Sequence, residues 1–344
     1  MRQPIGGYLE WAQGPLQPLP HDPVLPFQSA RAALLALLRA HAPPRLWLPD
    51  HTCDALVSAV QASQVPIAFY GLDDALLPVL PAQHGENEWL VYVNYLGLCE
   101  PQIDTLLASL PRQRVVIDNS QALFGRVRDC AATIYSPRKF LGVPDGGWLC
   151  SRLPVPPPNE VDTGSLMRSQ PLLRRLAQGP EAGYADFQRA EASLDDPTPK
   201  QMSDLTRSLL SHQDYERTAE CRQNNFRQLH TRLGARNELD LAYGRLDGKS
   251  SALASPAVPL CYPLLLREEA APLRLRLQQL RIYLPNYWAE TLRRASQDSL
   301  AYRLASRCLY LPCDQRYDAA DMHELATRVL DLLSSTRPNR PVVK

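Results

Sequence analysis

Short apolar segments and amphipathic helical patterns alternate along most of the chain. The apolar segments contain few polar residues, which predicts strands that are buried on both faces. Such strands occur in parallel sheets whose two faces are covered by helices. We therefore expect an α/β fold with a mostly parallel sheet. The expected strands are residues 46–48, 67–70, 89–93, 115–117, 132–135 and 148–150, and the expected helices between them are 29–41, 53–62 and 102–110.

The pattern changes in the second half of the chain. A proline run at 154–158 leads into a polar, helical stretch that extends to Asp196. Residues 202–233 have the spacing of one long helix or a broken pair, with Gly234 as a plausible stop. We expect a large domain over 1–245, a small C-terminal α+β domain over 246–335 and a disordered tail over 336–344. The small domain is expected to contain strands at 260–266, 282–284 and 309–311 and helices at 271–280 and 319–333.

Composition excludes several classes of protein. A net charge of +1 over 344 residues gives no electrostatic signature of binding to nucleic acid or an anionic membrane. The N-terminus lacks a signal-peptide pattern, and no apolar run approaches the roughly 18 residues of a membrane span, which together predict a soluble cytoplasmic protein. The eight cysteines form no CxxC pair and lie mostly in apolar runs, so we interpret them as reduced core residues.

Two ionisable residues follow neighbouring predicted strands. Asp118 follows the segment 114–117, at the end of a strand where open α/β sheets place their ligands. A carboxylate there can keep a pyridine nitrogen protonated, although the same residue can simply begin a turn or cap a helix. Lys139 follows the segment 132–135 and precedes several glycines. A partly desolvated lysine can carry out Schiff-base chemistry, but a loop lysine is more often a solvated surface group.

Other polar residues lie where they can complete such a site. Ser136 can donate its hydroxyl to a phosphate, as can the backbone amides near Ser29, Ala30 and Arg31, and Arg138 can add charge. Ordinary helix capping explains Ser29 equally well. His51 and Thr52 follow the strand at 46–48 and are expected to face the same pocket. The sequence contains no dinucleotide, P-loop or zinc-protease motif, and its histidines have no metal-like spacing.

Together these motifs resemble the DegT/DnrJ-type sugar aminotransferases, which are pyridoxal-phosphate enzymes of fold type I. The resemblance covers nearly the whole chain. It implies a large domain with a mostly parallel sheet of the seven-stranded type, a small α+β domain and a homodimer with shared active sites. The motifs that carry it are Gly6-Gly-Tyr-Leu-Glu10, Ser29-Ala-Arg-Ala-Ala-Leu34, Pro49-Asp-His-Thr-Cys-Asp-Ala55, Asp118-Asn-Ser-Gln-Ala122, Ser136-Pro-Arg-Lys139 with Gly146-Gly147, Ile282-Tyr-Leu-Pro-Asn-Tyr-Trp288 and Leu309-Tyr-Leu-Pro-Cys313.

The resemblance also implies residue roles. Lys139 would hold the cofactor covalently, Asp118 would contact the ring nitrogen and Gln121 the ring's phenolic oxygen. The phosphate would be held by Ser136 and by the backbone of Ser29, Ala30 and Arg31.

The sequence departs from the family pattern at two positions. Cys53 stands where family members stack an aromatic ring on the cofactor, with His51 as a possible substitute. Around Lys200 the loop that usually reaches the neighbouring subunit's phosphate is replaced, which leaves Lys200 as the candidate for that contact.

The leading functional hypothesis is a pyridoxal 5'-phosphate-dependent aminotransferase. It would move an amino group from an amino acid, expected to be glutamate, to a ketone or aldehyde such as a keto-sugar. A decarboxylase, an elimination enzyme or a retro-aldol lyase would use the same cofactor, and a non-catalytic scaffold is a third hypothesis. Arg31, Arg138 and Arg281 are the candidates for binding a substrate carboxylate.

Overall fold

A computed structural model of the protein describes residues 14–81, 85–239 and 257–335. The predicted domain boundary at residue 245, the predicted tail at 336–344 and the motif at 6–10 lie outside these described residues. Within the described part of the chain, no helix is long and apolar enough to cross a membrane. All eight cysteines are free thiols, and six of them are buried.

An eight-stranded sheet forms the centre of the molecule, with strand order β1-β8-β7-β6-β5-β2-β3-β4. Neighbouring strands from β7 through β6, β5 and β2 to β3 are parallel, while β1, β8 and β4 pair antiparallel at the two ends. The predicted α/β class with a mostly parallel sheet is confirmed. The strands are β1 (Leu25–Phe27), β2 (Leu46–Pro49), β3 (Ile67–Leu72), β4 (Pro78–Val79), β5 (Trp89–Val93), β6 (Val115–Asn119), β7 (Ala132–Tyr135) and β8 (Gly147–Ser151).

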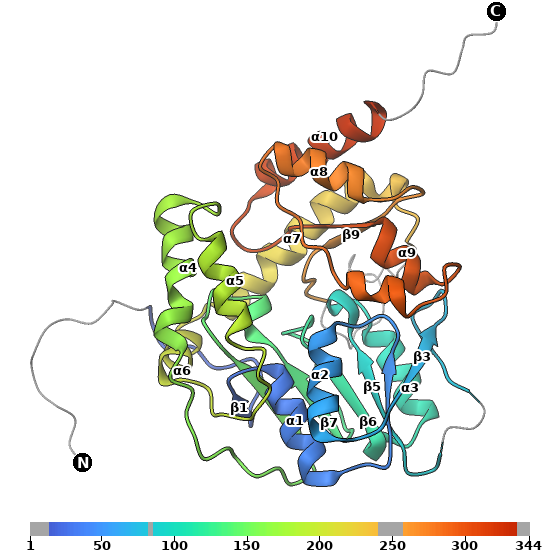
Figure 1. Ribbon diagram of the computed structural model, residues 1–344. Coiled ribbons are helices and arrows are strands. Elements are labelled where there is room, and N and C mark those ends of the chain that lie inside the picture. The colour runs from blue at the N-terminus through green and yellow to red at the C-terminus, as the bar shows by residue number, and fades with distance from the viewer. Residues whose placement is uncertain (1–13, 82–84, 240–256, 336–344) are drawn as a thin grey trace, which may run out of the picture.

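Both faces of the sheet are buried, as the apolar strands predicted. Successive side chains of a strand point to opposite faces, so Val116 of β6 packs in one hydrophobic cluster while Val115 and Ile117 pack in the other. Helices α1 (Ala30–His41) and α2 (Asp54–Ser63) cover the first face, whereas α3 (Glu100–Ser109) and α7 (Tyr215–Leu233) contribute to the second cluster. Figure 1 shows α1 and α2 in front of β5, β6 and β7.

The helical region between β8 and α7 divides into short helices. The stretch predicted to be helical up to Asp196 forms a hairpin of α4 (Ser165–Gln178) and α5 (Tyr184–Ala192), which stands beside the sheet in Figure 1. The pattern at 202–233 is a broken pair, α6 (Asp204–Leu210) and α7. The break follows from capping, because the Asp214 side chain accepts a hydrogen bond from the Arg217 amide and so starts a new helix.

A second, smaller unit of secondary structure follows. It contains an antiparallel pair of strands, β9 (Tyr262–Leu265) and β10 (Cys308–Leu311), with helices α8 (Ala271–Gln279), α9 (Leu300–Arg307) and α10 (Ala319–Ser335). The strand predicted at 282–284 was wrong. Its first amide, that of Ile282, donates to the Leu277 carbonyl at 2.9 Å and so closes the end of α8, and Arg281 before it has a left-handed φ of 61°.

A glycine allows β8 to approach the start of α1. Ser29 and Gly146 form a β-bridge, and the Gly146 amide donates to the Gln28 carbonyl at 2.7 Å. A Cβ atom on Gly147 would collide with the Ser29 carbonyl carbon and the Ala30 amide nitrogen. The close approach fixes the N-terminal end of α1 against the strand that follows Lys139.

We expect Gly147→Ala to lower the free energy of unfolding by about 1–3 kcal/mol, because backbone atoms must move to admit the methyl group. Gly142→Ala is the matched control, since a Cβ there meets no atom within 4 Å. Urea denaturation of the two variants and the wild type measures the difference. Equal stabilities for the two variants would show that the collision is relieved at no cost.

Candidate functional site

A pocket of about 510 Å³ lies at the carboxyl ends of the parallel strands. Val93, Asp118 and Ile134, which pair across β5, β6 and β7, all line it. Ligands in open α/β sheets bind at this edge because the loops that leave the strands diverge there. The structure therefore brings Asp118 and the residues after β7 to one cavity, as the sequence predicted.

Asp118 is held in a fixed orientation at the bottom of the pocket. It is 7% exposed, and its Oδ1 atom accepts a hydrogen bond from the Ser120 amide at 2.8 Å. That bond leaves Oδ2 to face a ligand, because no described residue donates to it. A buried carboxylate in this position favours a cation or a protonated ring nitrogen beside it.

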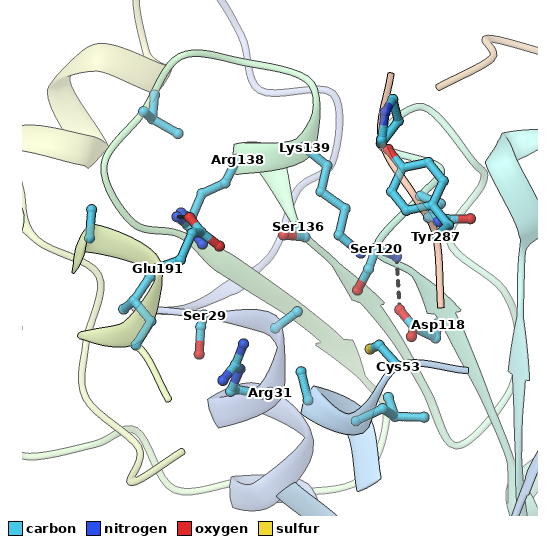
Figure 2. A pocket seen from close by; sticks show the side chains of 18 of the residues that line it. Ser29, Arg31, Cys53, Asp118, Ser120, Ser136, Arg138, Lys139, Glu191 and Tyr287 are labelled. Atoms are coloured by element: carbon cyan, nitrogen blue, oxygen red, sulfur yellow. Dashed lines mark hydrogen bonds and ion pairs between the residues drawn. The ribbon is translucent and has the colours of Figure 1, made fainter. Parts of the chain in front are cut away.

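Lys139 ends the 3-10 helix η3 (Pro137–Lys139), directly after β7. Its side chain is exposed to the cavity, and no described residue forms an ion pair with it. Figure 2 shows the chain extending from η3 toward Ser120 and Asp118. The amine and the carboxylate thus approach the same volume from two neighbouring strands.

A buried arginine fixes the turn that carries Lys139. Arg222 of α7 is 2% exposed, donates to the Phe140 carbonyl at 3.2 Å and places its guanidinium 4.5 Å from the Phe140 ring centroid. The Gln315 side chain donates to the same carbonyl at 2.8 Å and accepts from Arg222 Nε at 3.0 Å. Burial lowers the pKa of Arg222 from its ordinary value, and no described carboxylate forms an ion pair with it. The residue next to Lys139 is therefore tied to α7 and to the segment after β10.

Gln121 presents one unsatisfied donor. Its Oε1 atom accepts a hydrogen bond from the Leu96 amide at 3.0 Å, which determines which end of the amide is oxygen. The Nε2 group is buried and has no partner among the described residues. Because Gln121 lines the pocket, a ligand oxygen can satisfy that donor.

The other end of the pocket contains the start of α1 and two arginines, Arg31 and Arg138. Ser29 caps α1 by accepting from the Ala32 amide at 3.2 Å, and Ser29, Ala30 and Arg31 all line the cavity. The N-terminal end of a helix combines free amides with a positive dipole end and so favours an anion. Ser136 is buried at the same cavity, and Figure 2 shows Ser29, Arg31 and Arg138 on the side away from Asp118.

Three residues singled out from the sequence lie outside the pocket. His51 is 2% exposed and packs between the rings of Tyr95 and Trp288, so burial lowers its pKa to about 3. His51 therefore does not line this pocket itself but packs on Trp288, which does, and its role at a cofactor stays a prediction. Lys200 and Arg281 also lie elsewhere, with Lys200 bonded through its backbone to Gln28 and Arg281 paired with Glu181 at 2.7 Å. Cys53, the residue before α2, does line the pocket.

The remaining wall comes from segments that sequence reasoning missed. Tyr287 and Trp288 reach the pocket from the segment after α8, and Trp288 has a left-handed φ of 55°. Both aromatic residues belong to the motif at 282–288, which the sequence pattern placed in a strand of the small domain and not at the pocket. The α4–α5 hairpin supplies a second group for which no local sequence signal exists: Arg168, Pro171, Leu172, Phe187, Ala190 and Glu191.

Comparison with solved structures identifies the fold. TlmJ, an aminotransferase from Streptoalloteichus hindustanus, shares 16% identity over 91% of this chain and 86% of that chain, with a TM-score of 0.63. The sugar aminotransferase CalS13 from Micromonospora echinospora shares 17% identity over 91% and 87%, with a TM-score of 0.55. The PLP form of Spr1654 from Streptococcus pneumoniae shares 12% identity over 92% and 88%, with a TM-score of 0.60. The chain has the fold of these aminotransferases. No protein-family model and no curated protein matches the sequence.

We expect Arg222→Ala to lower the free energy of unfolding by about 2–4 kcal/mol, because it removes several charge-assisted hydrogen bonds and a buried side chain. Arg227→Ala on the exposed side of α7 is the control and should change stability by less than about 0.5 kcal/mol. Thermal and urea unfolding measure both variants. A loss no larger than that of the control would mean that the Phe140 carbonyl is held by Gln315 alone.

Proposed function

We propose that the protein is a pyridoxal 5'-phosphate-dependent aminotransferase. It would transfer an amino group from an amino acid donor, expected to be glutamate, to a keto or aldehyde acceptor such as a keto-sugar. The observation that carries the proposal is the placement of Asp118 and Lys139 in one pocket whose opposite end is a helix N-terminus with two arginines. The fold shared with aminotransferases, including one in a PLP form, supports it.

The pocket residues fit the chemical groups of the cofactor. Asp118 Oδ2 would pair with the ring nitrogen, and the unsatisfied Nε2 donor of Gln121 would bond the ring's phenolic oxygen. Ser136 and the first residues of α1, Ser29 to Arg31, would bind the phosphate. Cys53 lies at the pocket as well, where its thiol offers a small apolar contact.

The composition of the chain supports the role of Lys139. Only four of its 37 basic residues other than histidine are lysines, at positions 139, 200, 249 and 344. Arginine stays protonated at any pH that proteins tolerate, so a guanidinium cannot serve as an amine nucleophile or proton carrier. Lysine is the basic side chain that can. Position 139 therefore carries the one type of cation that this chemistry requires.

Each residue would contribute a separate step. The cofactor supplies an electron sink that stabilises negative charge at the substrate carbon. Lys139 would bind the cofactor and, once displaced by the donor, would move a proton to or from the substrate carbon through its Nζ atom. Asp118 would hold a proton at the ring nitrogen, and the apolar side chains of Leu172 and Phe187 would exclude water from the entrance.

The cofactor should bind covalently to Lys139. Adding pyridoxal 5'-phosphate should produce a visible absorbance band, and borohydride reduction followed by peptide mass spectrometry should locate the adduct on Lys139. Lys139→Ala should abolish the band, whereas Lys200→Ala, which changes a lysine outside the pocket, should retain it. A wild-type protein that develops no band, or an adduct on Lys200, contradicts the proposal.

Asp118→Asn should separate binding from catalysis. The amide keeps the size of the side chain but carries no charge, so the turnover number should fall by about 100- to 1,000-fold while the absorbance band persists. Stopped-flow absorbance with glutamate as donor measures the first half-reaction. A rate within a factor of about three of the wild type would exclude an electrostatic role for Asp118.

The homodimer and the cytoplasmic location remain predictions from the sequence.

A further inference from the structure

The two arginines at the α1 end of the pocket are each paired with an acid from the same segment. Arg138 forms an ion pair with Glu191 of α5, and Arg31 forms one with Asp195, three residues after α5, at 3.0 Å. Glu191 itself lines the pocket. Figure 2 shows Arg138 and Glu191 side by side on the same side of the cavity as Ser29 and Arg31.

The charges at this end of the pocket cancel. Two guanidinium groups carry two positive charges, and Glu191 and Asp195 carry two negative ones. A phosphate monoester brings about 1.5 to 2 further negative charges near neutral pH. A phosphate that binds beside Arg138 therefore also approaches the Glu191 carboxylate.

The Arg138 side chain is mostly buried beside Glu191. It is 19% exposed, and its Nε atom is buried with no partner among the described residues. The Glu191 side chain is 43% exposed, so water can solvate it when the pair opens. An ion pair of this kind contributes little to folding stability, because solvent screens it. The pair instead affects the affinity of Arg138 for any anion that binds beside it.

We propose that Glu191 competes with the phosphate of the bound cofactor for Arg138 and so weakens the affinity for phosphate-bearing ligands. The inference rests on the proposed function for the identity of the ligand. Competition is reciprocal, because two ligands that share one group must each weaken the binding of the other. Phosphate binding therefore loosens the attachment of α5. Since Phe187 and Ala190 of α5 line the same pocket, phosphate binding is coupled to the wall that α5 forms.

Glu191→Gln tests the proposal, because it removes the charge and keeps the size of the side chain. The variant should bind pyridoxal 5'-phosphate and inorganic phosphate about three- to tenfold more tightly than the wild type, as expected for removal of one partly screened charge. Pyridoxal, which lacks the phosphate, should bind both proteins equally. Glu324→Gln, which alters a glutamate paired with Arg328 on α10, is the matched control and should change none of the three affinities.

Absorbance titration measures the two pyridoxal ligands, and calorimetry measures inorganic phosphate. The difference between Glu191→Gln and the wild type should shrink as salt is added. Hydrogen exchange gives a readout that is independent of activity. Inorganic phosphate should accelerate amide exchange in α5 of the wild type, and should leave α5 of Glu191→Gln unchanged.

An unchanged or weaker affinity of Glu191→Gln for pyridoxal 5'-phosphate and inorganic phosphate overturns the proposal. Equal tightening for pyridoxal also overturns it, because the effect would then lie at the ring and not at the phosphate. A wild-type protein that gives no absorbance band contradicts the proposed function but not the competition between Glu191 and phosphate. In that case the inorganic phosphate titration still decides whether Glu191 competes for Arg138.

Discussion

The hydrogen bonds on the Phe140 carbonyl hold the candidate site together. Arg222 donates to it from α7, and Gln315 donates to it from the segment after β10. Arg222 also donates to the carbonyls of Pro259 and Leu260, just before β9. A buried cation without a described acid partner is costly unless such carbonyls surround it. These hydrogen bonds therefore stabilise the packing of α7, the segment before β9 and the segment after β10 against the Phe140 turn. Lys139 is the residue before Phe140.

The sheet explains why Asp118 and the start of α1 lie at opposite ends of the pocket. Asp118 belongs to β6 at the centre of the sheet, while the start of α1 lies beside β8 nearer the edge, where Gly147 allows a close approach. The separation between Asp118 and the start of α1 is thus set by the distance across β6, β7 and β8. Lys139 leaves β7, between the two ends. A ligand with a basic ring nitrogen at one end and an anion at the other matches this layout better than a ligand with one charged group.

Sequence patterns predicted the parts of the molecule that depend on local burial. The central strands were predictable because both of their faces are apolar, and Asp118 and Lys139 were predictable because strand ends converge. The directions in which individual side chains point could not be predicted in the same way. His51 follows β2 at the correct edge, but Tyr95 and Trp288, both distant in sequence, enclose its ring. The strand predicted at 282–284 failed because the Ile282 amide is already bonded to the end of α8. The pocket wall formed by α4 and α5 depends on how the hairpin packs, which no local pattern encodes.

The α4–α5 hairpin adds a wall of apolar and acidic side chains to the pocket that contains Asp118 and Lys139. Leu172 and Phe187 present apolar surface, whereas Glu191 brings a carboxylate next to Arg138. A carboxylate on that wall disfavours a second anion near Arg138, while apolar side chains favour ligand carbon over solvated polar groups. In the proposed aminotransferase, the groups that would bind the cofactor come from the sheet and α1, and the groups that would discriminate among acceptors come from the hairpin and from Tyr287. In the proposed aminotransferase, a change of acceptor would require changes in the hairpin and would leave the sheet edge as it is.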